Sequence, residues 1–322
     1  MSMKLTMKDP YSKVRILSPR IRGYIDLLRP FTLLAPIFVS MFIMLASLVY
    51  NNVYQSEGFN AWHTAILMMQ ASLTLALCNA ASNALNQATD VEADQISKPY
   101  RPIPRGIVAP DEAQSLALIL YLFVLLRSIT INERFGILVF LIMIFTITYS
   151  FPPRIKKYLF LNQIWIAIPR GFLGILASWS VFGDPLQKEP LFIGIIALLY
   201  FIGSMTTKDI VDKIADKQTG THTLVNTYGL RKAAFISLPF LIGPFAAIPV
   251  LIKYGLLNSY LMLLTVFIIP SFAVFYLMIK HHESKSLENV QAWVLMYVNY
   301  LFFAITFTSL IIFGELGFFT SV

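Results

Sequence analysis

The chain contains little cysteine, histidine or charge. Its 322 residues include one cysteine, Cys78, and four histidines. A single thiol excludes an intramolecular disulfide and a metal site built from several thiolates. The histidines show no spacing typical of metal ligands. Charged residues make up 13% of the chain, against ~25% in soluble domains, so the composition argues against a soluble fold.

Hydrophobic residues make up 57% of the chain and form long runs. A membrane-spanning helix needs ~20 apolar residues. The runs are continuous rather than alternating, so they predict helices and not a β-barrel. We therefore expect an all-α integral membrane fold, a single polytopic domain over residues 1–322. The nine predicted transmembrane helices are 31–50, 64–85, 111–127, 135–151, 161–182, 190–207, 233–252, 257–279 and 290–313.

Basic residues orient these helices. Most of the 25 Lys and Arg residues lie in the N-terminal segment and in every second loop after it. Because Lys and Arg favour cytoplasmic loops, this bias predicts a multi-pass protein of the cell membrane. Its basic leader, residues 1–24, and its N-terminus would be cytoplasmic, and its C-terminus outside. The same bias explains the net charge of +8 without a nucleic-acid partner.

An acidic motif follows the second apolar run. Residues 86–105 read NQATDVEADQISKPYRPIPR. Asn86, Asp90 and Asp94 are spaced i, i+4, i+8, which places them on one face of a helix, where like charges repel. Mg²⁺ suits such oxygens and usually binds one or two carboxylates together with a substrate phosphate. The simpler alternative is a solvated helix end outside the membrane.

A second acidic motif follows the sixth run. Residues 205–220 read MTTKDIVDKIADKQTG, and Asp209, Asp212 and Asp216 again share one helical face. Pairing of Asp209 with Lys213 on a plain surface is the alternative. The two motifs lie four helices apart. Helices two to five and six to nine are therefore candidates for two four-helix units, with helix one as an extra and a central cavity between them.

Cations accompany the first motif. Lys98, Arg101 and Arg105 alternate with prolines, which hold a loop extended. Rigidly presented Lys and Arg side chains bind phosphate well, although a loop that only follows the orientation rule would also be basic. Carboxylates beside such cations predict a site for a metal and a diphosphate.

These residues resemble a known family. Asn86-x₃-Asp90-x₃-Asp94 followed by KPYRPIPRG resembles the first signature of the UbiA superfamily of intramembrane prenyltransferases. Lys208-Asp209, continuing to Asp212, Asp216 and THTLVNTYG, is similar to the second. Tyr100 departs from the adjacent Lys-Arg-Pro of many members, which leaves the register of the neighbouring Lys98 and Arg101 open.

The resemblance implies Mg²⁺-dependent transfer, with Mn²⁺ as an alternative ion, of a prenyl group from a prenyl diphosphate to a lipophilic acceptor within the bilayer. Members use quinone precursors, prenylglyceryl phosphate, haem or chlorophyllide as acceptors, and the sequence leaves the choice open. By resemblance, the metals would bind Asn86, Asp90, Asp94, Asp212 and Asp216, with Asp209 close by. The diphosphate would contact Lys98, Arg101, Arg105 and Lys208.

The implied chemistry needs further groups. Cations stabilise a leaving diphosphate, and aromatic faces stabilise the resulting carbocation. Tyr149, at the end of the fourth run, is the aromatic residue that we expect to face that cation. Arg154 and Arg170, with Lys156 and Lys157, indicate an anionic acceptor, either a carboxylate or a phosphate. Arg170 lies within an apolar run, where charge is costly, and snorkelling to the interface is its alternative.

Two other functions share part of this pattern. An ion-coupled secondary transporter also uses carboxylates, but it places them near the midplane in broken helices. Here the carboxylates follow the ends of apolar runs on one side. A membrane scaffold would need no matched acidic faces.

Overall fold

The computed structural model describes residues 18–280 and 291–318, and the elements assigned in these ranges are helices. Most of the predicted leader therefore lies outside the described residues. Side chains cap several helix starts: Asn60 accepts a hydrogen bond from His63 N at 3.0 Å, and Asn132 from Phe135 N at 2.8 Å. The longer helices are α2 (Leu34–Tyr50), α3 (Ala61–Thr89), α5 (Pro110–Ile129), α6 (Glu133–Ser150), α9 (Lys188–Ser204), α12 (Leu230–Ala246), α14 (Ile268–Lys280) and α15 (Gln291–Glu315).

Eight described helical stretches are long and apolar enough to cross a membrane. Several include a shorter helix that continues a longer one, such as η1 (Pro30–Leu33) before α2, α13 (Ile248–Lys253) after α12 and η6 (Ser259–Phe267) before α14. These eight stretches cover eight of the nine predicted runs. The multi-pass all-helical fold is confirmed, and the count of nine stays a prediction.

The remaining predicted run, 161–182, is divided. It consists of α7 (Leu161–Ala167), the π-helical turn η4 (Ile168–Leu173) and α8 (Gly174–Trp179). Pro169 has no N–H to donate, which explains why regular α-helical bonding is interrupted here. Gly171 packs directly against the main chain of α9, because a Cβ at this position would lie 2.7 Å from Leu198 N.

The helices surround a central space and bury two hydrophobic cores. Neighbouring contacts run from α2 through α3, α5, α6, η4, α9, α12, α14 and α15 back to α2. One core draws mainly on α3, α5 and α6, and the other on α9, α12, α14 and α15. This division agrees with the two predicted units, and both α2 and the α7–η4–α8 stretch contribute to both cores.

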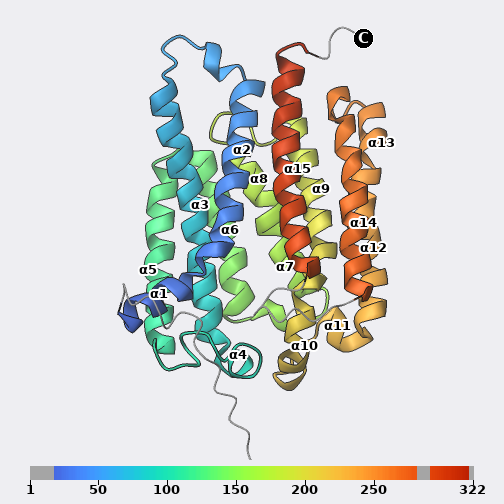
Figure 1. Ribbon diagram of the computed structural model, residues 1–322. Coiled ribbons are helices and arrows are strands. Elements are labelled where there is room, and N and C mark those ends of the chain that lie inside the picture. Colours follow the sequence, from blue (N-terminus) through green and yellow to red (C-terminus); the bar gives the residue numbers. More distant parts are fainter. Residues whose placement is uncertain (1–17, 281–290, 319–322) are drawn as a thin grey trace, which may run out of the picture.

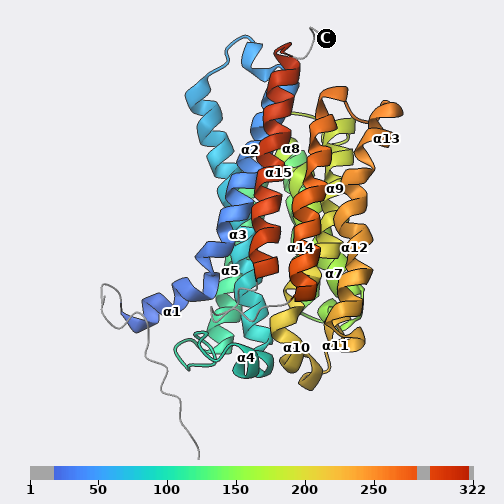
Figure 2. The ribbon, with the colours of Figure 1, turned by 45° about the vertical axis from the view of Figure 1, so that its right-hand side comes forward.

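Four short helices gather at one end of the bundle (Figure 1). They are α1 (Pro19–Leu28), α4 (Val91–Ser97), α10 (Asp209–Gln218) and α11 (Leu224–Tyr228). Helix α1 projects sideways from the bundle (Figure 2). Amide side chains of α3 hold it: Asn83 donates to Leu28 O at 3.1 Å and Gln87 to Leu27 O at 2.7 Å. Asn83 therefore serves as a contact between α3 and α1.

A buried cluster joins the helices at the opposite end. The Trp179 ring lies 5.4 Å from the Tyr50 ring, centroid to centroid, and Tyr50 donates to the buried Glu189 carboxylate at 2.6 Å. Ser47 donates to Trp179 O at 2.7 Å. These contacts tie α2, α8 and α9 together away from the acidic motifs.

Candidate active site

A cavity of about 540 Å³ lies within the ring of helices. Its lining comes from α2, α3, α6, the α7–η4–α8 stretch, α9 and α15, and from α4 and α10 beyond them. Most of the charged side chains gather at the end formed by α4 and α10, whereas apolar, aromatic and uncharged polar side chains, together with Arg170, line the part between the long helices. The predicted site residues in its lining are Asn86, Asp90, Asp94, Lys98, Arg101, Tyr149, Arg154, Arg170, Lys208, Asp212 and Asp216.

The spacing of the first acidic motif predicted one unbroken helix, but the structure divides the motif between two helices. Helix α3 ends at Thr89, and Asp90 is the junction residue before α4, with φ −109° and ψ 26°. Asp94 N still donates to Asp90 O at 2.8 Å, so the turn is only locally distorted. Asn86, Asp90 and Asp94 therefore still face the same cavity.

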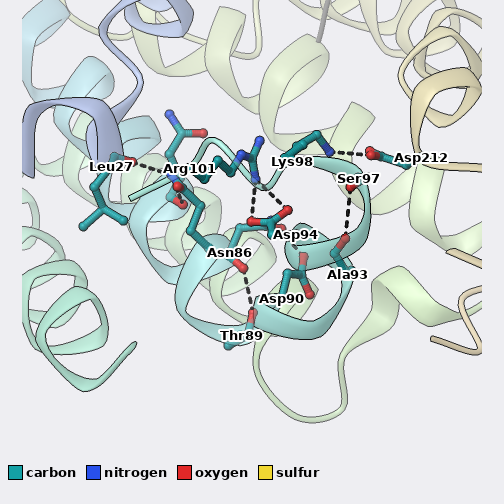
Figure 3. A network of polar contacts seen from close by, with 12 residues as sticks. Leu27, Asn86, Thr89, Asp90, Ala93, Asp94, Ser97, Lys98, Arg101 and Asp212 are labelled. Carbon is teal, nitrogen blue, oxygen red and sulfur yellow. Dashed lines mark hydrogen bonds and ion pairs between the residues drawn. The ribbon is translucent and has the colours of Figure 1, made fainter. Parts of the chain in front are cut away.

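Each carboxylate of the first motif has cationic partners. Arg101 donates to both oxygens of Asp94, at 3.0 and 2.8 Å, and both side chains are buried (Figure 3). Asp90 accepts from Arg154 at 3.1 Å and from Lys156. Burial lowers the pKa of Lys156, despite the opposing effect of Asp90.

The proline-rich loop after α4 links the two motifs. Lys98 donates from this loop to Asp212 on α10, across the mouth of the cavity (Figure 3). Burial acts to raise the pKa of Asp212, but Lys98 and Lys208 outweigh it and leave this pKa below its usual value. Arg105 is exposed and is not part of the lining, so its predicted place beside the other cations is not found.

The second motif lies on α10, as predicted, and its three carboxylates differ. Asp209 is buried outside the lining and accepts from Lys208 at 2.6 Å. It therefore holds Lys208, which lies beside the Tyr149 hydroxyl. Asp216 lines the cavity and forms no hydrogen bond or ion pair with a described side chain. Burial, together with the Asp209 carboxylate, raises the pKa of Asp216 to about 8.

The donor set suits a hard divalent cation. Among residues 18–280 and 291–318, no three Asp, Glu, His or Cys side chains form a ready metal cage. Mg²⁺ needs no such cage when substrate phosphate completes its shell. Among the described residues, Asp216 has no ion-pair partner and the buried Asp209 Oδ2 has no hydrogen-bond partner, so the Asp216 oxygens in the lining remain available to a ligand.

The chain that forms this cavity matches a known protein family. The family model that matches residues 40–301 describes the UbiA prenyltransferase family. The chain belongs to that family. The prediction of a membrane prenyltransferase is thereby confirmed.

Relatives of this UbiA-family protein differ in their named reactions. A digeranylgeranylglyceryl phosphate synthase of Methanosphaera stadtmanae is 26% identical, over 84% of this chain and 93% of its own. A 2-acyl-4-prenylphloroglucinol 6-prenyltransferase of Humulus lupulus is 28% identical, over 83% and 69%. A solved UbiA homologue of Archaeoglobus fulgidus bound to GPP and Mg²⁺ has a TM-score of 0.67 at 18% identity, covering 90% and 99%. That likeness shows the shared fold.

Sequence reasoning missed part of the UbiA-family cavity. Lys156 was seen only as one of several loop cations, and nothing in PPRIKK distinguishes it from Lys157. The cavity-lining Trp293, Tyr297 and Tyr300 of α15 were also missed. Their i, i+4, i+7 spacing on one helical face was a usable signal, but aromatic residues are common in membrane helices.

Proposed function

We propose that this protein transfers a prenyl group from a prenyl diphosphate to a lipophilic, anionic acceptor within the membrane, and that it requires Mg²⁺. The observation that carries the proposal is the convergence of both acidic motifs on one cavity mouth, joined by Lys98 and Asp212. The relatives named above and the GPP and Mg²⁺ of the solved homologue support it.

The residues at the mouth divide into two groups. Asp90, Asp94, Asp212 and Asp216 would hold Mg²⁺, with Asn86 donating to Asp90 Oδ2 at 2.9 Å and orienting it. Lys98, Arg101 and Lys208 would bind the diphosphate. Bound Mg²⁺ supplies charge neutralisation for the leaving group.

The protein's own residues would bind the diphosphate, face the positive carbon and limit its contact with water. Lys and Arg side chains at the mouth hold the diphosphate and stabilise its charge as the allylic C–O bond breaks. Tyr149 lies beside Lys208, at the boundary between the charged mouth and the apolar cavity, where its ring would face the positive carbon. Aromatic and aliphatic side chains beyond it, among them Phe145, Trp165 and Phe201, would limit the access of water, which would otherwise react with that carbon.

The acceptor hypothesis has two candidates. A prenylglyceryl phosphate is favoured by the synthase of M. stadtmanae. A phenolic, quinone-type acceptor is kept as the second candidate because the H. lupulus relative is named for a phloroglucinol. In both candidate acceptors, the nucleophile is a hydroxyl group or a ring carbon that lies next to a lipophilic part of the molecule.

The test is a transfer assay on purified protein with a radiolabelled prenyl diphosphate and both acceptors, with and without EDTA. We expect labelled product that is lost with EDTA and restored by Mg²⁺. Asp111→Ala, which changes an exposed carboxylate outside the cavity lining, is a matched control and should leave transfer unchanged. Product formation that survives complete chelation would contradict the metal requirement. Cation flux in liposomes without product would favour the transporter instead.

We also infer that the cavity mouth faces the cytoplasm. The supporting observation is that α4 and α10 share the end of the molecule opposite to the 51–60 loop (Figure 1). In a Cys78→Ser background, Ser56→Cys should react with an impermeant maleimide added to intact cells, and Gln218→Cys only after lysis. The reverse pattern would overturn this orientation.

A further inference from the structure

Arg170 lies deep in the cavity, away from the carboxylates at the mouth. Asn162 and Ser178 also line the cavity and lie on either side of Arg170 along the same helical stretch. At a rise of ~1.5 Å per residue, Arg170 is displaced by about 12 Å along the helix axis from each of them. A charge at this depth of a membrane helix is costly and calls for a function. Because Arg170 lines the cavity, snorkelling to the interface does not explain it.

Helix α15 holds Arg170 at two points. Arg170 Nη1 donates to the Tyr297 hydroxyl at 2.9 Å, and the Tyr300 hydroxyl donates to Arg170 O at 3.2 Å. The Tyr297 ring is itself packed against Trp293, with 4.5 Å between centroids. Both the guanidinium and the main chain of Arg170 are therefore fixed from across the cavity.

Within the described part of the chain, the charge of Arg170 is not compensated. No described carboxylate forms an ion pair with it. Tyr297 takes up one of the five N–H donors of the guanidinium, so the others remain for a ligand. A planar guanidinium binds a phosphate or carboxylate through paired hydrogen bonds.

The other cations of the same region are engaged elsewhere. Arg154 and Lys156 bind Asp90 at the mouth. The sequence grouped these residues with Arg170 as one acceptor-binding set, and the structure separates them. The diphosphate-binding candidates Lys98 and Lys208 also lie at the mouth, in contact with the second motif.

We propose that Arg170 forms a second anion subsite, which binds the phosphate or carboxylate of the acceptor, and that Tyr297 is the positioning residue that directs its guanidinium. This proposal rests on the proposed function and adds to it the place where the acceptor is recognised. The diphosphate is held at the mouth, and the acceptor's anion is held about midway along the cavity. The enzyme therefore distinguishes charged acceptors from neutral ones.

The test compares acceptor pairs that differ only in charge. One pair is geranylgeranylglyceryl phosphate and the same lipid without phosphate, and the other is 4-hydroxybenzoate and its methyl ester. A charge-assisted hydrogen bond contributes ~1.5–3 kcal/mol, so the wild type should prefer the charged member of the productive pair by about 10–100-fold in kcat/KM. In Arg170→Met this preference should disappear while KM for the prenyl diphosphate stays unchanged. Arg170→Lys, which keeps the charge without the fork, should be intermediate.

Tyr297→Phe tests the positioning role. It should weaken the preference several-fold by raising KM for the charged acceptor, and it should have no further effect in the Arg170→Met background. Tyr200→Phe is the matched control, because it removes a tyrosine hydroxyl bonded to Met296 O at 3.3 Å, and neither Tyr200 nor Met296 lies in the lining. It should leave the preference unchanged.

Three results would overturn the proposal. The wild type could show no preference for the charged member of either pair, Arg170→Met could raise KM for the diphosphate and the acceptor equally, or Tyr297→Phe could match wild type. Each of these outcomes leaves prenyl transfer itself intact. Absence of product with every acceptor would instead count against the proposed function.

Discussion

The two acidic motifs carry similar residues in different electrostatic surroundings. The first follows a broken helix, and its carboxylates bind Arg101, Arg154 and Lys156. The second lies on the unbroken α10. There Asp212 takes its partner, Lys98, from the loop that follows the first motif, and Asp216 has none among the described side chains.

This contrast teaches that like sequence signals need not give like sites. Both carboxylates of the first motif are already paired, one with a cation of the following loop and the other with two cations of the segment between α6 and α7. The second depends more on what enters the cavity, because its Asp216 has no cationic partner among the described side chains. The two motifs should therefore differ in their contribution to stability, in their pH dependence and in their tolerance to substitution.

The largest effect is expected from removing one carboxylate of each motif. Asp90→Ala and Asp212→Ala should each lower kcat/KM by at least ~100-fold, because loss of several kcal/mol of charge stabilisation is expected at a metal site. Only Asp90→Ala should also lower the Tm clearly, since it leaves the buried Lys156 without its carboxylate. Transfer assays and thermal unfolding in detergent measure the two effects. Equal Tm values for both variants would remove the distinction between the motifs.

A moderate effect is expected from pH. Folding raises the pKa of Asp216 to about 8 from its ordinary value of 3.8. The folded state therefore binds this proton more tightly than the unfolded state, so its contribution to stability is lost as pH rises from about 4 to about 8. In EDTA, the Tm should fall over this range more steeply for wild type than for Asp216→Asn. Apparent Mg²⁺ affinity should rise up to about pH 8, because the carboxylate must lose its proton to bind metal.

Parallel pH curves for wild type and Asp216→Asn would show that this carboxyl is not the responsible group. Thr219→Ala is a useful companion control, since it changes a neighbouring lining residue of the same end of α10 without changing charge.

The smallest effect is expected at Arg105. Arg105→Ala should change kcat/KM by less than about twofold, since exposed charges contribute little and Arg105 lies outside the cavity. Lys98→Met, in the same loop, should instead raise KM for the prenyl diphosphate by about 10-fold or more, because it removes a charge-assisted contact. Titration with the diphosphate measures both. A loss at Arg105 as large as that at Lys98 would return Arg105 to the diphosphate site.

Most of the fold followed from the sequence, because long apolar runs leave few alternatives in a membrane. The convergence of the motifs was also predictable, since the charge bias placed both on one side. The break at Asp90 was not, because the Asp94 N to Asp90 O bond preserves the i, i+4 spacing on which the argument depended. The π-turn could have been suspected from Pro169, but its register depends on tertiary packing.

The side-chain partners were the least predictable part. Which cation meets Asp90 depends on how a loop more than sixty residues away folds back over α3. Arg105 and Arg101 are equivalent in an alternating Pro–Arg pattern, yet one is buried against Asp94 and the other is exposed. Such differences arise from long-range packing, which a local spacing argument does not contain.

Gly171 lies so close to the main chain of α9 that this contact fixes the position of η4. A methyl group there would have to displace the main chain at Leu198 or push η4 inward. Since η4 carries Arg170, a substitution at Gly171 would move the guanidinium without touching its chemistry. Selectivity among acceptors could then be altered by a methyl group at Gly171, which faces α9 and not the cavity. A substitution at Gly171 could therefore change the position of the Arg170 charge while the arginine itself is kept.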